Sequence, residues 1–110
     1  MTFQHKELAS GRWNKFSFFF QMANIGSEVG RALKWQQKDA KNSRLAAERA
    51  LELLDLTIED PKNHTPSRLK ELWRLREFMA DSLFFGNEYK TAEKSWRSYF
   101  DAFAWASALE

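Results

Sequence analysis

Hydrophobic residues recur every three to four positions along most of this chain, which is the spacing of one face of an α-helix. The pattern predicts four helices, at about residues 17–38, 43–59, 67–85 and 92–108. No window shows the alternation of β-branched residues that is typical of strands. The first predicted helix has its apolar face at Phe18, Met22, Ile25, Val29 and Leu33.

Each of the other three predicted helices also carries one apolar face. These faces consist of Ala47, Leu51, Leu54 and Ile58; of Leu69, Leu72, Trp73, Met79 and Leu83; and of Trp96, Phe100, Phe103 and Ser107. Amphipathic helices joined by short loops bury these faces against one another. The sequence therefore predicts an all-α fold, a four-helix antiparallel up-down bundle.

Loop residues set the predicted helix ends. Asp60-Pro61 should end the second helix, because the residue before a proline avoids α geometry. Gly86-Asn87 is a stop signal for the third helix. Asn42 or Ser43 should cap the second helix, and Thr91 should cap the fourth.

The two ends of the chain need separate interpretation. We predict that residues 1–16 form an N-terminal arm or a short extra helix, which could pack through Phe3, Leu8 and Trp13. The final Leu109-Glu110 looks like the remnant of an expression tag, and we give it no functional weight. With 110 residues, positions 1–110 fit a single domain.

Two glycines stand inside the first predicted helix, four residues apart. Gly26 and Gly30 lie beside its apolar face, and each costs about 1 kcal/mol relative to alanine in a helix interior. Close approach of a neighbouring helix would offset this cost. We therefore predict close helix packing at both positions.

Composition narrows the possible chemistry. The chain has no cysteine, which removes disulfides, thiol nucleophiles and cysteine-based metal sites, and suits a reducing cytoplasm. The N-terminal segment shows no secretory signal, and the apolar cluster Phe16–Phe20 is far short of the roughly 20 residues that a membrane span needs. We expect a cytoplasmic protein that does not insert in a membrane and uses no cofactor.

Acidic residues offer one candidate site. Glu48, Glu52 and Asp55 share a face of the second predicted helix, and Glu77 and Asp81 share a face of the third. Carboxylates on two antiparallel helices could hold Mg²⁺ or Mn²⁺, as in a metal-dependent nucleotide hydrolase. The plainer interpretation pairs these carboxylates with arginines on the solvent face, and we expect that arrangement and no metal site.

Basic residues offer a second candidate site, at the end of the first predicted helix. A positive stripe beside an aromatic ring can follow phosphates and stack a base. The alternative is a solvated face whose cations favour a helix C-terminus. A net charge of only +2 adds little support for a nucleic-acid partner. The stripe consists of Arg31, Lys34, Trp35, Lys38, Lys41 and Arg44.

A polar stripe borders the apolar face of the first predicted helix. Gln21, Asn24, Glu28 and Arg31 could line a cleft, but hydrogen bonding between helices at the edge of the core is the favoured interpretation. His64, in the loop before Pro66, has no partner spacing that would indicate catalysis. We assign no catalytic residue.

Aromatic residues exceed what one small core needs. The chain has 10 Phe and 5 Trp, and several lie outside the four apolar faces. Large exposed apolar patches are rare in soluble monomers, and interfaces favour aromatic residues. We therefore predict a homodimer with two-fold symmetry, unless the N-terminal arm covers the surplus. The interface candidates are Phe19, Phe20, Phe84, Phe85 and Trp105.

Several segments together resemble a group of small uncharacterised prokaryotic proteins. They are NIGSEVGRALKW (24–35), RALELLDLTIEDP (49–61), RLKELWRLREFMAD (68–81) and FGNEY (85–89), within a resemblance that covers about residues 8–106. That group has no established activity, so the resemblance implies an all-α fold and no site residues. Its loop after the Asp-Pro pair is more basic and aromatic than Lys62–Thr65 here.

Two better-known helical classes fit less well. HEPN ribonucleases place a histidine four to six residues after an arginine, and neither His5 nor His64 has that spacing. The all-α nucleotide pyrophosphatases share only acidic helices with this chain. The sequence therefore favours a non-enzymatic association module, which binds itself or a partner protein. Nucleic-acid binding and metal-dependent hydrolysis are the alternatives.

Overall fold

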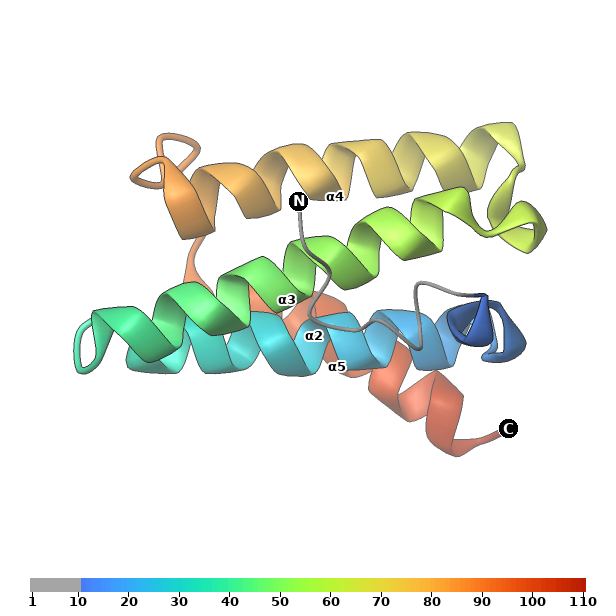
Figure 1. The fold of residues 1–110 in the computed structure, drawn as a ribbon, viewed down its shortest axis with the longest axis horizontal. Coiled ribbons are helices and arrows are strands. Elements are labelled where there is room, and N and C mark those ends of the chain that lie inside the picture. The colour runs from blue at the N-terminus through green and yellow to red at the C-terminus, as the bar shows by residue number, and fades with distance from the viewer. Residues whose placement is uncertain (1–10) are drawn as a thin grey trace.

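The computed structural model describes residues 11–110, and within them it contains four α-helices and no strand. The helices are α2 (Phe18–Trp35), α3 (Ala40–Glu59), α4 (Pro66–Phe84) and α5 (Glu93–Ala108). Two short 3₁₀ helices, η1 (Arg12–Lys15) and η2 (Pro61–Asn63), precede α2 and α4. Successive helices run in opposite directions (Figure 1), which confirms the predicted all-α up-down bundle. Residues 1–10 of the predicted arm lie outside the described part.

Three helices begin at a side-chain cap. Ser17, Asp39 and Thr65 each accept a hydrogen bond from a backbone N–H three residues later, at 3.1 Å, 3.1 Å and 3.3 Å. These bonds satisfy N–H groups that a helix start otherwise leaves unpaired. Pro66 follows the Thr65 cap at the first position of α4, where its missing N–H costs nothing.

The prediction of the first turn was wrong by several residues. α2 ends at Trp35, not Lys38, because the Trp35 carbonyl accepts bonds from the N–H groups of both Lys38 and Asp39. Asp39 then caps α3 in place of Asn42 or Ser43. Ser43 is buried instead and donates its hydroxyl to the Ala32 carbonyl at 2.7 Å.

The predicted cap of the fourth helix was also wrong. The N-cap of α5 is Ala92, which has no side-chain bond to make. Thr91 is used by the preceding turn, where its N–H donates to Asn87 Oδ1 and its carbonyl accepts from Asn87 Nδ2. Asn87 has a positive φ of 57°, and it follows Gly86, whose φ of 84° is accessible to glycine at little cost.

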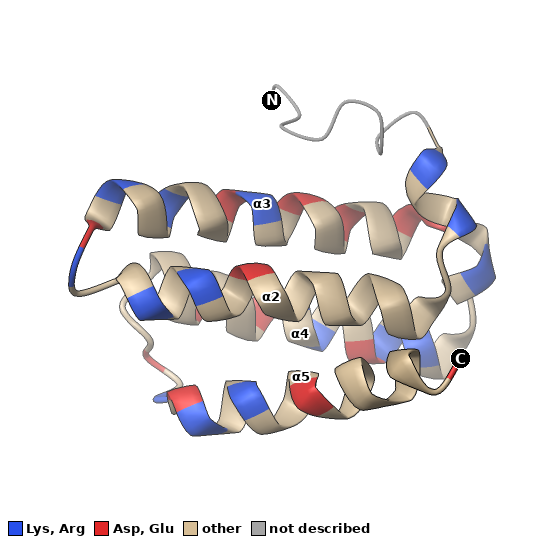
Figure 2. Cartoon of the chain, turned by 90° about the horizontal axis from the view of Figure 1, so that it is seen from below, with Lys and Arg blue, Asp and Glu red and all other residues tan. Residues whose placement is uncertain are grey.

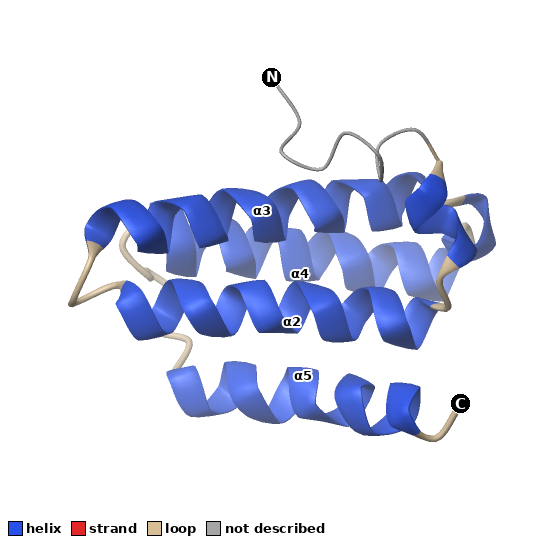
Figure 3. Cartoon of the chain, turned by 60° about the horizontal axis from the view of Figure 1, so that its bottom comes forward, coloured by secondary structure: helices blue, strands red, loops and turns tan. Residues whose placement is uncertain are grey.

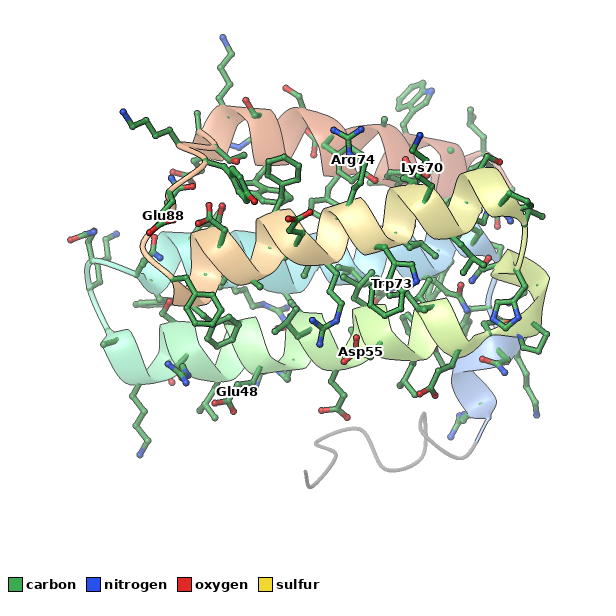
Figure 4. All side chains as sticks on the ribbon, turned by 90° about the horizontal axis from the view of Figure 1, so that it is seen from above. Glu48, Asp55, Lys70, Trp73, Arg74 and Glu88 are labelled. Carbon is green, nitrogen blue, oxygen red and sulfur yellow. The ribbon has the colours of Figure 1, made fainter. Side chains whose placement is uncertain are left out.

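The core draws on all four helices. Its most buried large side chains include Met22, Ile25, Leu54, Leu72 and Met79. The prediction that Trp73 belongs to the core was wrong, since this residue is 56% exposed. Leu72, Leu75 and Met79 already fill the inner face of α4, and Trp73 lies on the side of that helix nearer α3 (Figure 4).

The helices do not all pack against one another. α2 is central and packs on both α3 and α5, whereas α4 packs mainly on α3. The backbones of α4 and α5 do not come close, and side chains connect the two helices: Trp96 Nε1 donates to Ser82 Oγ at 3.3 Å, and Tyr99 donates to Glu71 at 3.1 Å. Figure 3 shows α5 beside α2, and Figure 1 shows α5 diverging from α4 toward its C-terminal end. One side of the bundle is therefore open.

Gly26 permits the contact between α2 and α5. A Cβ atom placed on Gly26 would lie 2.6 Å from Cβ and Cγ of Phe100, so α5 approaches α2 as closely as the prediction required. The prediction of close helix packing at Gly30 was wrong, because a Cβ atom there would meet nothing within 4 Å. Gly30 borders a hollow of about 380 Å³ between α2 and α5.

We expect Gly26→Ala and Gly30→Ala to change stability in opposite directions. The Gly26 variant must displace Phe100, which should cost about 1–3 kcal/mol of unfolding free energy. The Gly30 variant gains helix propensity without a clash and should be more stable by about 0.5–1 kcal/mol. Urea unfolding of both variants measures the difference. Equal stabilisation of both would show that Gly26 is not a contact point.

A buried polar network closes the end of the bundle where α2 begins and α3 ends. Gln21, Thr57, Asp60 and Asn63 are all at most 2% exposed. Gln21 Nε2 donates to Asp60 Oδ2 at 2.8 Å, and Asn63 Nδ2 donates to Gln21 Oε1 at 3.1 Å. Trp13 Nε1 donates to Thr57 Oγ1 at 2.9 Å. These mutual bonds offset the cost of burying polar groups, so the network is a structural one.

Over residues 11–110, the helices that are long enough to span a bilayer are not apolar enough to do so.

Candidate functional site

A groove between α4 and α5 forms a concave surface with a volume of about 870 Å³. It lies on the open side of the bundle, where the backbones of these two helices stay apart. We call it the α4–α5 groove. Its lining consists of Phe18, Phe19, Ser67, Arg68, Lys70, Glu71, Arg74, Leu75, Phe78, Thr91, Ser95, Trp96, Tyr99 and Phe103.

Aromatic rings form the floor and one wall of the groove. Phe18 from the start of α2 meets Phe103 of α5 edge to face, with ring centroids 5.7 Å apart. Tyr99 lies between Phe100 and Phe103 at 5.1 Å and 5.3 Å. Such contacts fix the rings, so the apolar surface of the groove is already formed in the chain alone.

Uncharged stretches of two helices lie at this floor. α2 carries no charged residue from Phe18 to Ser27, and α5 carries none from Ala102 to Ala108. Figure 2 shows these two uncharged segments on neighbouring helices. A partner that reaches the floor therefore meets apolar side chains from both helices.

Arg68 connects the groove to the buried polar network. Its guanidinium carbon lies 4.1 Å from the centre of the Phe18 ring, and its Nη1 donates to Asn63 Oδ1 at 3.5 Å. A cation over an aromatic face is held by the ring quadrupole. The geometry therefore fixes a positive charge at the mouth of an apolar groove.

A hydrogen bond between Tyr99 and Glu71 crosses from α5 to α4. Tyr99 Oη donates to Glu71 Oε2 at 3.1 Å. Burial raises the pKa of Tyr99 well above its usual value, and the nearby Glu71 carboxylate raises it further. Tyr99 therefore stays protonated and keeps its role as a donor to the one carboxylate in the lining.

Two further cations line the α4 wall. Figure 4 shows Lys70 and Arg74 on the side of α4 that faces α5, opposite to Trp73. In the described part of the chain, neither Lys70 nor Arg74 forms an ion pair. The α4 edge therefore carries three positive charges and one carboxylate that is already bonded to Tyr99.

The acidic candidates do not assemble into one site. Asp55 pairs with Arg76 across α3 and α4, at 2.8 Å and 3.4 Å, and this hydrogen bond raises the pKa of Arg76. Asp81 accepts bonds from the backbone N–H groups of Glu88 and Tyr89 and so closes the turn after α4. Between residues 11 and 110, no three His, Asp or Glu side chains could hold a metal ion together.

The remaining acidic candidates are also engaged. Glu77 accepts from the Tyr89 hydroxyl at 3.1 Å, and Glu48 pairs with Arg44 at 3.3 Å. Glu52 is buried on α3. Figure 4 labels Glu48 and Asp55 along α3, away from the α4–α5 groove, with Asp55 on the side of α3 that meets α4.

The basic candidates lie where α2 ends and α3 begins, and several are bound to neighbours. Arg31 pairs with Glu28 at 2.8 Å, and Glu28 also accepts from Arg49 at 3.2 Å. Lys34 lies over the ring of Trp35, and Arg44 lies 4.8 Å from the centre of the Phe84 ring. Lys38 and Lys41 are exposed. The structure brings these cations to one end of the bundle, where Trp35 is only partly exposed.

The five interface candidates do not form a single surface. Phe19 lines the α4–α5 groove, and Phe20 stacks on Phe16 with centroids 4.6 Å apart. Phe84 packs on a small alanine cluster under Arg44 and is half-buried. Phe85 and Trp105 are the most exposed, at 71% and 72%.

The groove itself was not predicted from the sequence. Trp96 and Phe103 have helical spacing and were assigned to an apolar face of the fourth helix, and both also contribute to the core. The excess of aromatic residues near Phe18 and Phe103 was a weak indication of such a groove. Which aromatic faces stay uncovered depends on the helix that α5 packs against, and the periodicity of one helix does not contain that information.

Comparison with known proteins adds no homologue. No protein-family model matches the sequence, and searches of curated proteins and of solved structures find no significant similarity.

Proposed function

We propose that this chain is a non-enzymatic association module that binds a helical segment of another protein molecule in the α4–α5 groove. One observation carries the proposal: two neighbouring helices of the bundle leave an apolar, aromatic-lined groove of about 870 Å³ uncovered. An apolar groove of this kind is a common binding site for amphipathic helices. The cysteine-free sequence suits a reducing cytoplasm, where we place this association.

Self-association is the second form of the proposal. Trp105 is 72% exposed on α5 and lies outside the groove lining, so it provides a separate surface for a two-fold homodimer. Sedimentation velocity at tens of micromolar should then give twice the chain mass of 13.0 kDa. A single species of 13.0 kDa would exclude the homodimer, and binding to a partner protein would be the form of the proposal that stands.

Photo-crosslinking from inside the groove tests the main proposal. A photoreactive phenylalanine analogue at Phe78, which lines the groove, should crosslink to one bound protein segment. The matched control is the same analogue at Trp73, an exposed aromatic position on the opposite side of α4. The proposal predicts a defined product from position 78 and not from position 73. Equal products from both positions, or none from 78, would contradict it.

A further inference from the structure

The shape of the α4–α5 groove restricts what can occupy it. Along α4, a lining residue recurs every three to four positions, at Ser67, Glu71, Arg74 and Phe78. The α4 wall therefore extends over about three helical turns, roughly 16 Å. Ser95, Tyr99 and Phe103 repeat in the same way along α5. The groove therefore runs lengthwise between the two helices. A third helix lying along them fits this geometry better than a compact ligand.

The charge of the groove is asymmetric. Arg68, Lys70 and Arg74 lie on its α4 wall, and its carboxylate, Glu71, is bonded to the Tyr99 hydroxyl. The α5 wall adds Thr91 and Ser95, which carry no charge. An occupant with carboxylates along the edge that meets α4 would complement this arrangement.

The surroundings of these cations favour such an ion pair. Arg68 is half-buried over Phe18, so a carboxylate that reaches it pays little to order the arginine side chain. Lys70 and Arg74 hold no ion pair in the described part of the chain and are exposed. Apolar residues that cover the groove would exclude water around all three cations and strengthen their attraction for an anion.

The chain's own exposed helix faces do not match this chemistry. The exposed face of α3 has Leu45 among Lys41, Arg44 and Glu48, so its charges are mixed. On α5, Trp105 stands near Asp101, but no three-turn apolar stripe accompanies them. Neither of these two faces of a second copy therefore fits both the apolar floor and the basic edge.

We infer that the occupant of the α4–α5 groove is an amphipathic helix of a partner protein, with an apolar stripe of about three turns and acidic residues along one edge. The stripe lies on Phe18, Phe19 and Phe103, and the acidic edge meets Arg68, Lys70 and Arg74. This inference rests on the proposed function and adds the chemistry of the partner.

Three labelled helical peptides test the inference by fluorescence anisotropy with the full chain. They share one apolar stripe of leucines, and their edge positions carry glutamate, glutamine or lysine. The glutamate peptide should bind at least about tenfold more tightly than the lysine peptide at low salt, which corresponds to about 1.4 kcal/mol. This preference should shrink in 1 M salt, because exposed charges are screened.

Matched charge reversals identify the cations responsible. Lys70→Glu with Arg74→Glu should abolish the preference for the glutamate peptide. Lys94→Glu with Arg97→Glu makes the same change in net charge on α5 outside the groove, and it should leave the preference largely intact. Equal loss in both double variants would show only a long-range charge effect and overturn the inference.

The remaining outcomes separate the inference from the proposed function. If all three peptides bind equally, the acidic partner is wrong, but helix binding in the groove stands. If none binds up to about 1 mM, helix binding in the groove fails as well. If the glutamate peptide dissociates a homodimer of the chain, a second copy occupies the groove and the inferred partner is wrong.

Discussion

Trp13→Ala should lower the free energy of unfolding by about 3–5 kcal/mol, the range for removing a large aromatic side chain from a packed core. Trp13 is only 2% exposed and belongs to the main hydrophobic core. Its Nε1 also donates to Thr57 Oγ1, so the substitution removes a buried hydrogen bond. Because small domains are marginally stable, this loss should reduce the melting temperature by at least about 10 °C.

Trp105→Ala is the matched control, since it makes the same chemical change at a side chain that is 72% exposed. The control should stay within about 0.5 kcal/mol of the wild type in a monomeric sample. Thermal unfolding followed by circular dichroism compares the two variants. If Trp13→Ala unfolded at the wild-type temperature, the segment before α2 would not be anchored in the core.

Asp60→Ala should cost about 3 kcal/mol, because it removes a buried carboxylate together with its ion pair and hydrogen bonds. Asp60 is 2% exposed and pairs with Lys62, whose backbone N–H it also caps at 3.1 Å. The carboxylate is the acceptor for Gln21 Nε2 at 2.8 Å as well. Glu59→Ala is the control, because Glu59 is the neighbouring acid on the exposed face of α3, and its loss should change stability little.

The contribution of Asp60 should depend on pH. Burial raises the pKa of its carboxyl, but hydrogen bonds from Lys62 and Gln21 together outweigh burial and hold the pKa below the ordinary value of 3.8. A depressed carboxyl pKa stabilises the folded state fully above the unfolded pKa, and this contribution is lost as the pH falls through the folded pKa.

The stability gap between the wild type and Asp60→Ala should therefore be largest near neutral pH and narrow below pH 3.8. Urea unfolding at a series of pH values between neutral and acid measures this gap. A gap that stayed constant down to the most acid point would show that the Asp60 carboxylate does not gain its stabilisation from these hydrogen bonds.

Helix positions could be predicted from the sequence because the apolar period is a local property. Pro61 ends α3 where expected, and Pro66 opens α4. The error at the end of α2 has a local cause too. Asp39 competes with Asn42 and Ser43 as a cap, and all three residue types are good caps, so only the turn geometry decides among them.

The candidate site depended on information that no single helix contains. Neither Lys70 nor Arg74 was predicted to line a groove, because their place at its edge follows from α5 packing mainly on α2. The opposite error occurred at Trp73. Its spacing matched the apolar face of its helix and predicted burial, but the side chain is exposed. Arg76, the partner of Asp55, and Arg49, one of two arginine partners of Glu28, also come from a neighbouring helix. The sequence pattern reports only the spacing within one helix, so it could not show these pairs.

Nuclear magnetic resonance mapping with the glutamate peptide can show whether a helix binds in the α4–α5 groove, because it reports which backbone amides sense the bound helix. The account predicts that chemical-shift changes concentrate along residues 67–78 of α4, along 95–103 of α5 and at Phe18 and Phe19. Changes centred instead on the exposed face of α3, or around Trp105, would contradict the assignment of the α4–α5 groove as the surface through which this chain associates.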